Sequence, residues 1–158
     1  MLLNFASPIS FSFVCDKIPL TLPTIQQISV PSISLGNASI PTPFTKISQP
    51  GNIEYGDLSI SFKILEDYSN YLEIVDWINE LGHPESLNQY KYQKIDAFIL
   101  PQTSTKKTAL RIKLEGIQPS NLTIPQYDVT LTELLYLNAT VSFSFTSLKF
   151  IRANDIGC

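Results

Sequence analysis

Residues 51–85 read GNIEYGDLSISFKILEDYSNYLEIVDWINELGHPE, and this stretch decides the fold. Apolar and polar residues alternate over 58–64, which is the pattern of a strand with one buried face. The period then changes to that of an amphipathic helix over about residues 70–81. Asn70 and Glu73 have the spacing of a capping box, and Gly82 and Pro84 are typical of a helix end. The helix face expected to pack on the core consists of Tyr71, Ile74, Val75, Ile78 and Leu81.

The composition describes one ordinary domain of 158 residues with an unusually uncharged surface. Hydrophobic residues make up 44% of the chain and charged residues only 16%, below the roughly 25% of typical domains. Ser and Thr are plentiful instead, which fits either faces covered by neighbouring subunits or simply a Ser/Thr-rich β protein. The net charge of −3 argues against tight binding to nucleic-acid backbones. No apolar run is long enough to cross a membrane.

The remaining periodic segments predict strands. A first strand is expected over Ile9 to Cys15 rather than an export signal, because no basic residue precedes Lys17 and Pro8 interrupts the apolar run. Short strands follow at 95–100 and 109–114, 116–125 has no regular pattern, and a long strand over 136–151 has a bulge near Thr146. The sequence therefore predicts a mainly β fold: an antiparallel β-sandwich or partly closed barrel of seven or eight strands with one flanking helix.

A Pro-rich arm over about residues 23–50 is the second distinctive segment. Six prolines fall between Pro19 and Pro50, which keeps the intervening strands at a sheet edge or outside the main sheet. Gly36 and Asn37 are predicted to form the turn of a hairpin. Because an isolated hairpin is marginal in water, the arm is expected to bury its apolar residues against another chain. The candidate interface residues are Ile25, Ile28, Val30, Ile33, Leu35, Ile40 and Phe44.

No catalytic, metal or cofactor site is predicted. The single histidine, His83, lies beside a helix end, and no nucleophile pattern accompanies it. One histidine with two distant cysteines cannot supply the four ligands of a usual zinc site. The acidic helix residues Glu73, Asp76 and Glu80 are more typical of a solvated face than of a calcium site.

Aromatic residues with a polar end gather near the helix. Trp77 lies beside the apolar stripe, where it is expected at the core edge or against a partner. Tyr68, Tyr71, Tyr90 and Tyr92 surround the helix and the following loop. Such residues are enriched at protein interfaces, and a carbohydrate-binding β-sandwich would use the same types.

Two separated motifs resemble a family. Pro50–Gly51, the Gly56–Leu58 strand start and EDYSNYLEIVDWINELGHPES at 66–86 are similar to tail tube and tube-like proteins of phages with contractile, T4-like tails. Gly116–Ser120, GIQPS, resembles the family's Gly-x-x-Pro-Thr segment before the last long strand. The resemblance extends from about Leu20 to Phe150.

The resemblance implies a structural, non-enzymatic virion protein without cofactors. Its protomers would form hexameric rings that stack into a hollow tube, through which DNA passes without specific binding. The implied partners are other copies, the sheath, and other tail or baseplate proteins, in a virion tail assembled in the host cytoplasm. A tube-end component of the same fold, acting as initiator, terminator or baseplate–tube adaptor, is the alternative within the family.

Overall fold

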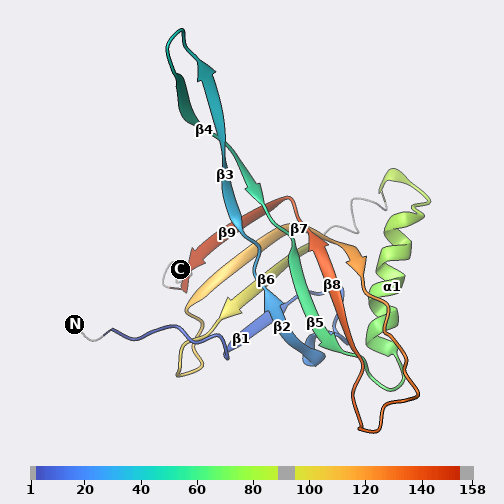
Figure 1. Cartoon of the computed structure of the whole chain (residues 1–158). Helices are drawn as coiled ribbons and strands as arrows, with labels where there is room; N and C mark the ends of the chain where they lie inside the picture. The colour runs from blue at the N-terminus through green and yellow to red at the C-terminus, as the bar shows by residue number, and fades with distance from the viewer. Residues whose placement is uncertain (1–2, 89–94, 154–158) are drawn as a thin grey trace.

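The computed structural model describes residues 3–88 and 95–153, which form nine strands and one α-helix (Figure 1). The expected mainly antiparallel β fold with one helix is confirmed, with more strands than the seven or eight predicted, and the described strands form a sandwich and not a closed barrel. A short 3-10 turn spans Leu22–Thr24, and the helix α1 spans Ser69–Gly82. The strands are β1 (Phe11–Val14), β2 (Ile25–Ser29), β3 (Ile33–Pro41), β4 (Lys46–Tyr55), β5 (Leu58–Lys63), β6 (Ile95–Pro101), β7 (Leu110–Leu122), β8 (Asn138–Ser144) and β9 (Ser147–Arg152).

Seven strands form the body, in the order β1-β6-β7-β8-β5-β2, with β9 also paired to β7. The first part of β7 pairs with β6 and β9, and its last part pairs with β8. This long strand therefore belongs to two layers, one containing β1, β6 and β9 and the other containing β8, β5 and β2. The strands β3 and β4 form a separate two-stranded sheet that projects from the body (Figure 1).

The core lies between these layers and beneath α1. Leu58, Ile60 and Phe62 on β5 are fully buried, as the alternation predicts. Their β8 neighbours Val141 and Phe143 are fully buried as well. Cys15 is buried at the end of the β1 segment, consistent with its expected role as a small apolar residue.

The helix packs on this core more deeply than the sequence indicates. Trp77 is only 1% exposed, and its ring lies against Phe143 with 5.8 Å between centroids, so the expectation of a core-edge tryptophan is wrong. The indole is large enough to reach the core from beside the apolar stripe. Of the five residues assigned to the helix core face, Ile74 is fully buried, Tyr71, Ile78 and Leu81 pack partly against the core, and Val75 is half-buried outside the core cluster.

The predicted capping box is wrong. Tyr68, in a left-handed conformation, precedes the helix and makes no side-chain capping bond. Asn70 lies inside the first turn instead and is fully buried, and its side-chain amide forms hydrogen bonds with neighbouring segments of the chain. Its Oδ1 accepts from the backbone N–H groups of Leu65 and Tyr71, and its Nδ2 donates to the Lys63 carbonyl and the Thr24 hydroxyl.

The helix exit also differs from its prediction. Gly82 is the last helical residue and has no positive φ, so it is not the left-handed residue that follows a helix. His83 takes the C-cap position, and its N–H donates to the Asn79 carbonyl.

The predicted hairpin turn at Gly36 and Asn37 is wrong, because both residues lie inside β3. The chain reverses at residues 42–45, where Thr42 and Thr45 hydrogen-bond to each other through backbone and hydroxyl groups. The arm therefore consists of β3, the turn and β4, residues 33–55, rather than residues 23–50. Gly36 marks a register shift, not a turn.

Two expectations for the C-terminal third are also corrected. The segment 116–125 was expected to be irregular, but β7 continues through Gly116 (φ 66°) to Leu122. Pro119 is tolerated because the ladder shifts register beside it. The predicted single strand 136–151 is divided into β8 and β9 at residues 145–146, and the two parts pair with opposite ends of β7.

Candidate assembly surfaces

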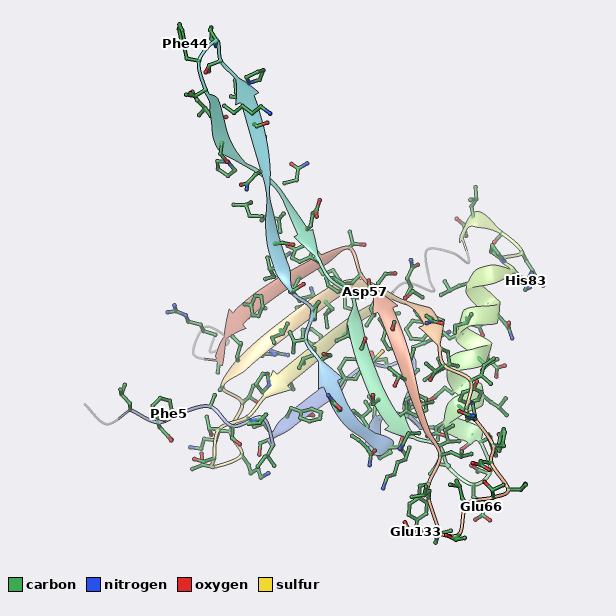
Figure 2. The ribbon with its side chains drawn as sticks, viewed as in Figure 1. Phe5, Phe44, Asp57, Glu66, His83 and Glu133 are labelled. Atoms are coloured by element: carbon green, nitrogen blue, oxygen red, sulfur yellow. The ribbon has the colours of Figure 1, made fainter. Side chains whose placement is uncertain are left out.

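The arm carries most of the residues expected at an interface. Ile33, Leu35 and Ile40 on β3 are all exposed, and Phe44 in the turn is 96% exposed. Figure 2 shows Phe44 at the tip of the arm, far from the body. Val30, between β2 and β3, is also exposed. An exposed apolar arm of this kind buries its side chains only when another chain covers them.

Ile25 and Ile28 lie elsewhere. They belong to β2, which pairs with β5 as the last strand of the body sheet, and they pack partly against the core. The Pro-rich segment therefore divides at Pro31 into an edge strand of the body and a free arm. The edge position agrees with the expectation for strands flanked by proline.

The arm has apolar residues that the sequence reasoning missed. Ile47 and Ile53 on β4 are exposed, and they pair across the hairpin with Ile40 and Leu35 respectively. Cross-strand apolar pairs of this type hold a two-stranded ribbon together. The alternation of Ile47 and Ile53 with polar residues was the available signal, but the misplaced turn left β4 without a partner strand.

Two glycines bring the arm strands close together. A side chain on Gly51 would lie 2.9 Å from the Gly36 carbonyl oxygen, closer than a Cβ can approach. The pair therefore permits the register shift between Leu35 and Asn37 in the middle of the arm.

A second apolar surface, also missed, is the segment 123–137 between β7 and β8, here called the apolar loop. It has no helix or strand, and Val129, Leu134 and Leu135 are among its exposed side chains. Together with residues at the ends of β2 and β5, its last part lines a groove of about 790 Å³. Figure 2 shows Glu133 of this loop on the side of the body away from the arm tip. Long structureless loops in compact domains are commonly binding elements.

Specific contacts hold the apolar loop against the body. The hydroxyls of Tyr68 and Tyr127 lie 2.7 Å apart, and this hydrogen bond raises the pKa of Tyr68. Lys63 lies 5.0 Å from the centroid of the Tyr136 ring, a cation–π contact. The loop is thus fixed at both ends while its apolar side chains stay exposed.

The acidic helix face is used structurally. The Glu73 carboxylate accepts hydrogen bonds from the N–H and the hydroxyl of buried Thr21, at 3.2 and 3.0 Å. Glu80 forms an ion pair with Lys17 at 3.0 Å. These contacts bind the β1–β2 connection to α1, so Glu73 and Glu80 are engaged in holding the fold.

The described residues contain no group of three or more His, Cys, Asp or Glu side chains that could hold a metal ion. Cys15 is buried, and burial raises the pKa of its thiol to about 11, which makes it a poor nucleophile. Of the aromatic residues expected around the helix, Tyr90 and Tyr92 lie outside the described residues, as does Cys158. Within the described part of the chain, no helix is long and apolar enough to span a membrane.

Comparisons with known proteins identify the class of fold. No protein-family model matches the chain, and no curated protein matches it in sequence. Among solved structures, the chain is similar to one titled as the tube-terminating cap of the anti-feeding prophage, with 15% identity and a TM-score of 0.74 over 97% of this chain and 95% of that one. A baseplate structure of the same particle matches with 14% identity and a TM-score of 0.71, over 96% and 98% of the two chains.

A structure from a second particle has a similar fold. The chain is similar to a structure of the sheath/tube terminator of an extracellular contractile injection system, with 17% identity, a TM-score of 0.69, and coverage of 95% of this chain and 99% of that one. At these identities the likeness is one of fold. The chain therefore shares its fold with proteins in structures of contractile injection systems, and nothing in these matches favours T4-like phages in particular.

Proposed function

We propose that this chain is a structural subunit of the tube layer of a contractile injection apparatus, positioned at an end of the tube. In this proposal its copies form a ring, hexameric as the sequence resemblance implies, around a central passage. It has no catalytic role and acts by joining the tube to the sheath, cap or baseplate proteins.

The observation that carries the proposal is the match over nearly the whole chain to a tube-terminating cap and to a sheath/tube terminator. A match of this coverage includes the projecting arm as well as the body, so the similarity is to the complete architecture. The exposed apolar residues of the arm supply the surface that an assembling subunit needs.

The arm suits assembly because it can contribute both backbone and side-chain contacts. A two-stranded ribbon has unpaired edges that can add to a neighbouring sheet, which gives affinity through main-chain hydrogen bonds. Its apolar side chains are then buried against the neighbour. The net charge of −3 on the chain is compatible with DNA as the cargo, since a protein without excess positive charge does not retain phosphates strongly.

Reconstitution with the other tube proteins tests the proposal. The purified chain, mixed with tube proteins of a contractile injection apparatus from the same source, is expected to form rings that bind tube ends in electron micrographs. Quantitative mass spectrometry of intact particles should then count about one ring of copies per particle. A chain that stays monomeric at high concentration and with the other tube proteins present would overturn the proposal.

The second candidate is the main tube subunit. It is favoured by a fold match to a sheath–tube complex with a TM-score of 0.66 and 15% identity, over 90% of this chain and 87% of that one. The same mass spectrometry separates the two, because a main tube subunit is present in many stacked rings. The carbohydrate-binding alternative loses its principal residue, since buried Trp77 cannot contact a glycan.

A further inference from the structure

The two layers of the body present outer faces of different chemistry. On the layer of β8, β5 and β2, the side chains opposite the buried row are uncharged and polar, apart from Lys63 at the end of β5. The central ones are Ser59, Ser61, Gln118, Thr140, Ser142 and Ser144, here called the hydroxyl face. The exposed β2 residues Gln27 and Ser29 extend it, since they pair with Ser61 and Ser59.

These side chains satisfy one another. The hydroxyls of Ser61 and Thr140 lie 3.1 Å apart, and the Gln118 amide donates to the Ser144 hydroxyl at 3.3 Å. The face is therefore a polar surface with part of its hydrogen-bonding capacity used internally. The next outward residue on β5 is charged Lys63, at the end of the strand beside Tyr136.

The opposite layer has an outer face rich in charged side chains, here called the charged face, which also includes the partly exposed apolar residues Phe98 and Ile151. Lys113 on β7 lies between Asp96 on β6 and Glu115, at 3.5 Å from each, and Glu115 also pairs with Lys149 on β9 at 2.9 Å. Most outward residues on both layers are partly exposed, so the difference between the two faces is mainly one of chemistry.

We infer that the hydroxyl face lines the central passage of the assembled ring. The inference rests on the proposed function. A stable protein contact buries apolar and aromatic side chains and is depleted in serine, so this face is poorly suited to hold a neighbouring subunit. The exposed apolar residues, which suit contacts, lie elsewhere: many are on the arm and the apolar loop, and others are in the N-terminal segment, such as Phe5 and Ile9, or on β9, such as Phe150.

A passage wall has the opposite requirement from an interface. Cargo that moves along it must not be held, so the wall should offer neither paired charges for ionic contacts nor apolar patches for burial. The hydroxyl face meets both conditions. It also continues directly into the arm, because β2 leads into β3 and β4 leads into β5 (Figure 1).

Cysteine accessibility tests the assignment on the assembled protein. In a Cys158→Ser background, Ser142→Cys reports on the hydroxyl face and Lys149→Cys on the charged face. Cys15 is buried, so its thiol is not expected to react with the maleimide in the folded protein. Each variant is labelled with biotin-maleimide, as free protomer and after assembly with the tube proteins, and is then probed with streptavidin, a globular protein expected to be too bulky for the passage.

The expected result is that assembly leaves biotin labelling of Ser142→Cys intact but abolishes its capture by streptavidin. The matched control Lys149→Cys should be captured in both states. Capture of assembled Ser142→Cys would place the hydroxyl face outside, and loss of its labelling would place it in a subunit contact. Loss of capture at Lys149→Cys with labelling retained would assign the passage to the charged face.

Each of those three outcomes overturns the inference while leaving the proposed function intact. Failure of both variants and of the unmodified chain to assemble with the tube proteins counts against the proposed function, and the inference falls with it.

Discussion

The body and the arm use apolar residues in opposite ways. In the body, Trp77, Phe62 and Phe143 are buried, so each contributes to the free energy of folding of one chain. In the arm, Ile33, Leu35 and Phe44 are exposed although they are as apolar as core residues. Residue type therefore does not tell which process a side chain stabilises. Its position in the fold does, and substitutions in the two regions should separate folding from assembly.

The largest effect is expected at Trp77. Trp77→Ala removes the side chain that lies on Phe143 and leaves a cavity in the core, which should lower the free energy of unfolding by about 3–5 kcal/mol. Urea denaturation followed by circular dichroism measures the loss. The matched aromatic in the arm is the control: Phe44→Ala should change the stability of the protomer by about 0.5 kcal/mol or less. Equal losses would mean that the arm tip packs on the body.

A smaller effect is expected at Asn70. Asn70→Ala leaves the Lys63 carbonyl and the Leu65 N–H without their side-chain partner at a buried position, which should cost about 1–3 kcal/mol. Thermal unfolding of the protomer provides the measurement. Asn52→Ala, an exposed position in β4 of the arm, is the control and should remain within about 0.5 kcal/mol of the unmodified chain. A neutral Asn70→Ala would show that the polar cluster at the start of α1 is dispensable.

The surface of the body should show a pH effect. The Lys149 ammonium and the Ser147 hydroxyl lower the pKa of Glu115 from 4.5 to about 2. Because the pKa is lower in the folded state, the stabilisation is complete above about pH 4.5 and is lost as the pH falls toward 2. NMR titration of the carboxyl should give a midpoint that rises in Lys149→Met. Lys107→Met, at the tip of the β6–β7 hairpin, should leave the midpoint unchanged. A low midpoint that persists in Lys149→Met would contradict the assignment of the shift to this ion pair.

The smallest effect on stability is expected in the arm, with a large effect on assembly. Ile33→Asp combined with Leu35→Asp should leave the unfolding transition of the protomer almost unchanged, because both side chains are exposed. The same double variant should fail to form rings in electron micrographs, since charged side chains would have to be buried. A protomer that unfolds with this double substitution would place the arm in the folding core.

Hydrogen exchange provides a finer test of the division at Pro31. Amides of β2 pair with β5 in the body and should be protected in the free protomer. Amides of β3 from Ile33 onward should exchange quickly in the protomer and become protected on assembly. Uniform exchange across both strands would remove the distinction between edge strand and arm.

The sequence was sufficient to predict the elements whose pattern is local. The alternation of β5 and the periodicity of α1 each arise from one buried face, so they can be read from one segment. The arm turn could not be read in this way, because Gly36 and Asn37 suit a turn and a register shift equally well. The pairing partner, β4, decides between the two.

The role of Asn70 and the depth of Trp77 depended on distant segments. Asn70 contacts Thr24, and Trp77 contacts Phe143, and neither partner is near in the sequence. For the assembly surfaces, the arm was detectable from its prolines. The apolar loop could not be detected from the sequence, since its apolar residues follow neither the period of a strand nor that of a helix.

The sequence separation between paired strands also determines the order in which the chain can fold. The body sheet depends on long-range pairings such as Ser61 on β5 with Thr140 on β8, which are 79 residues apart, whereas the two strands of the arm pair within one hairpin. Long-range pairings close slowly, because a large loop loses its entropy before the strands gain contacts. The arm hairpin is thus complete in sequence during synthesis long before β8 exists to pair with β5. Until β8 has been synthesised, the nascent chain exposes an unpaired edge of β5 together with the apolar arm, and both favour aggregation during this interval.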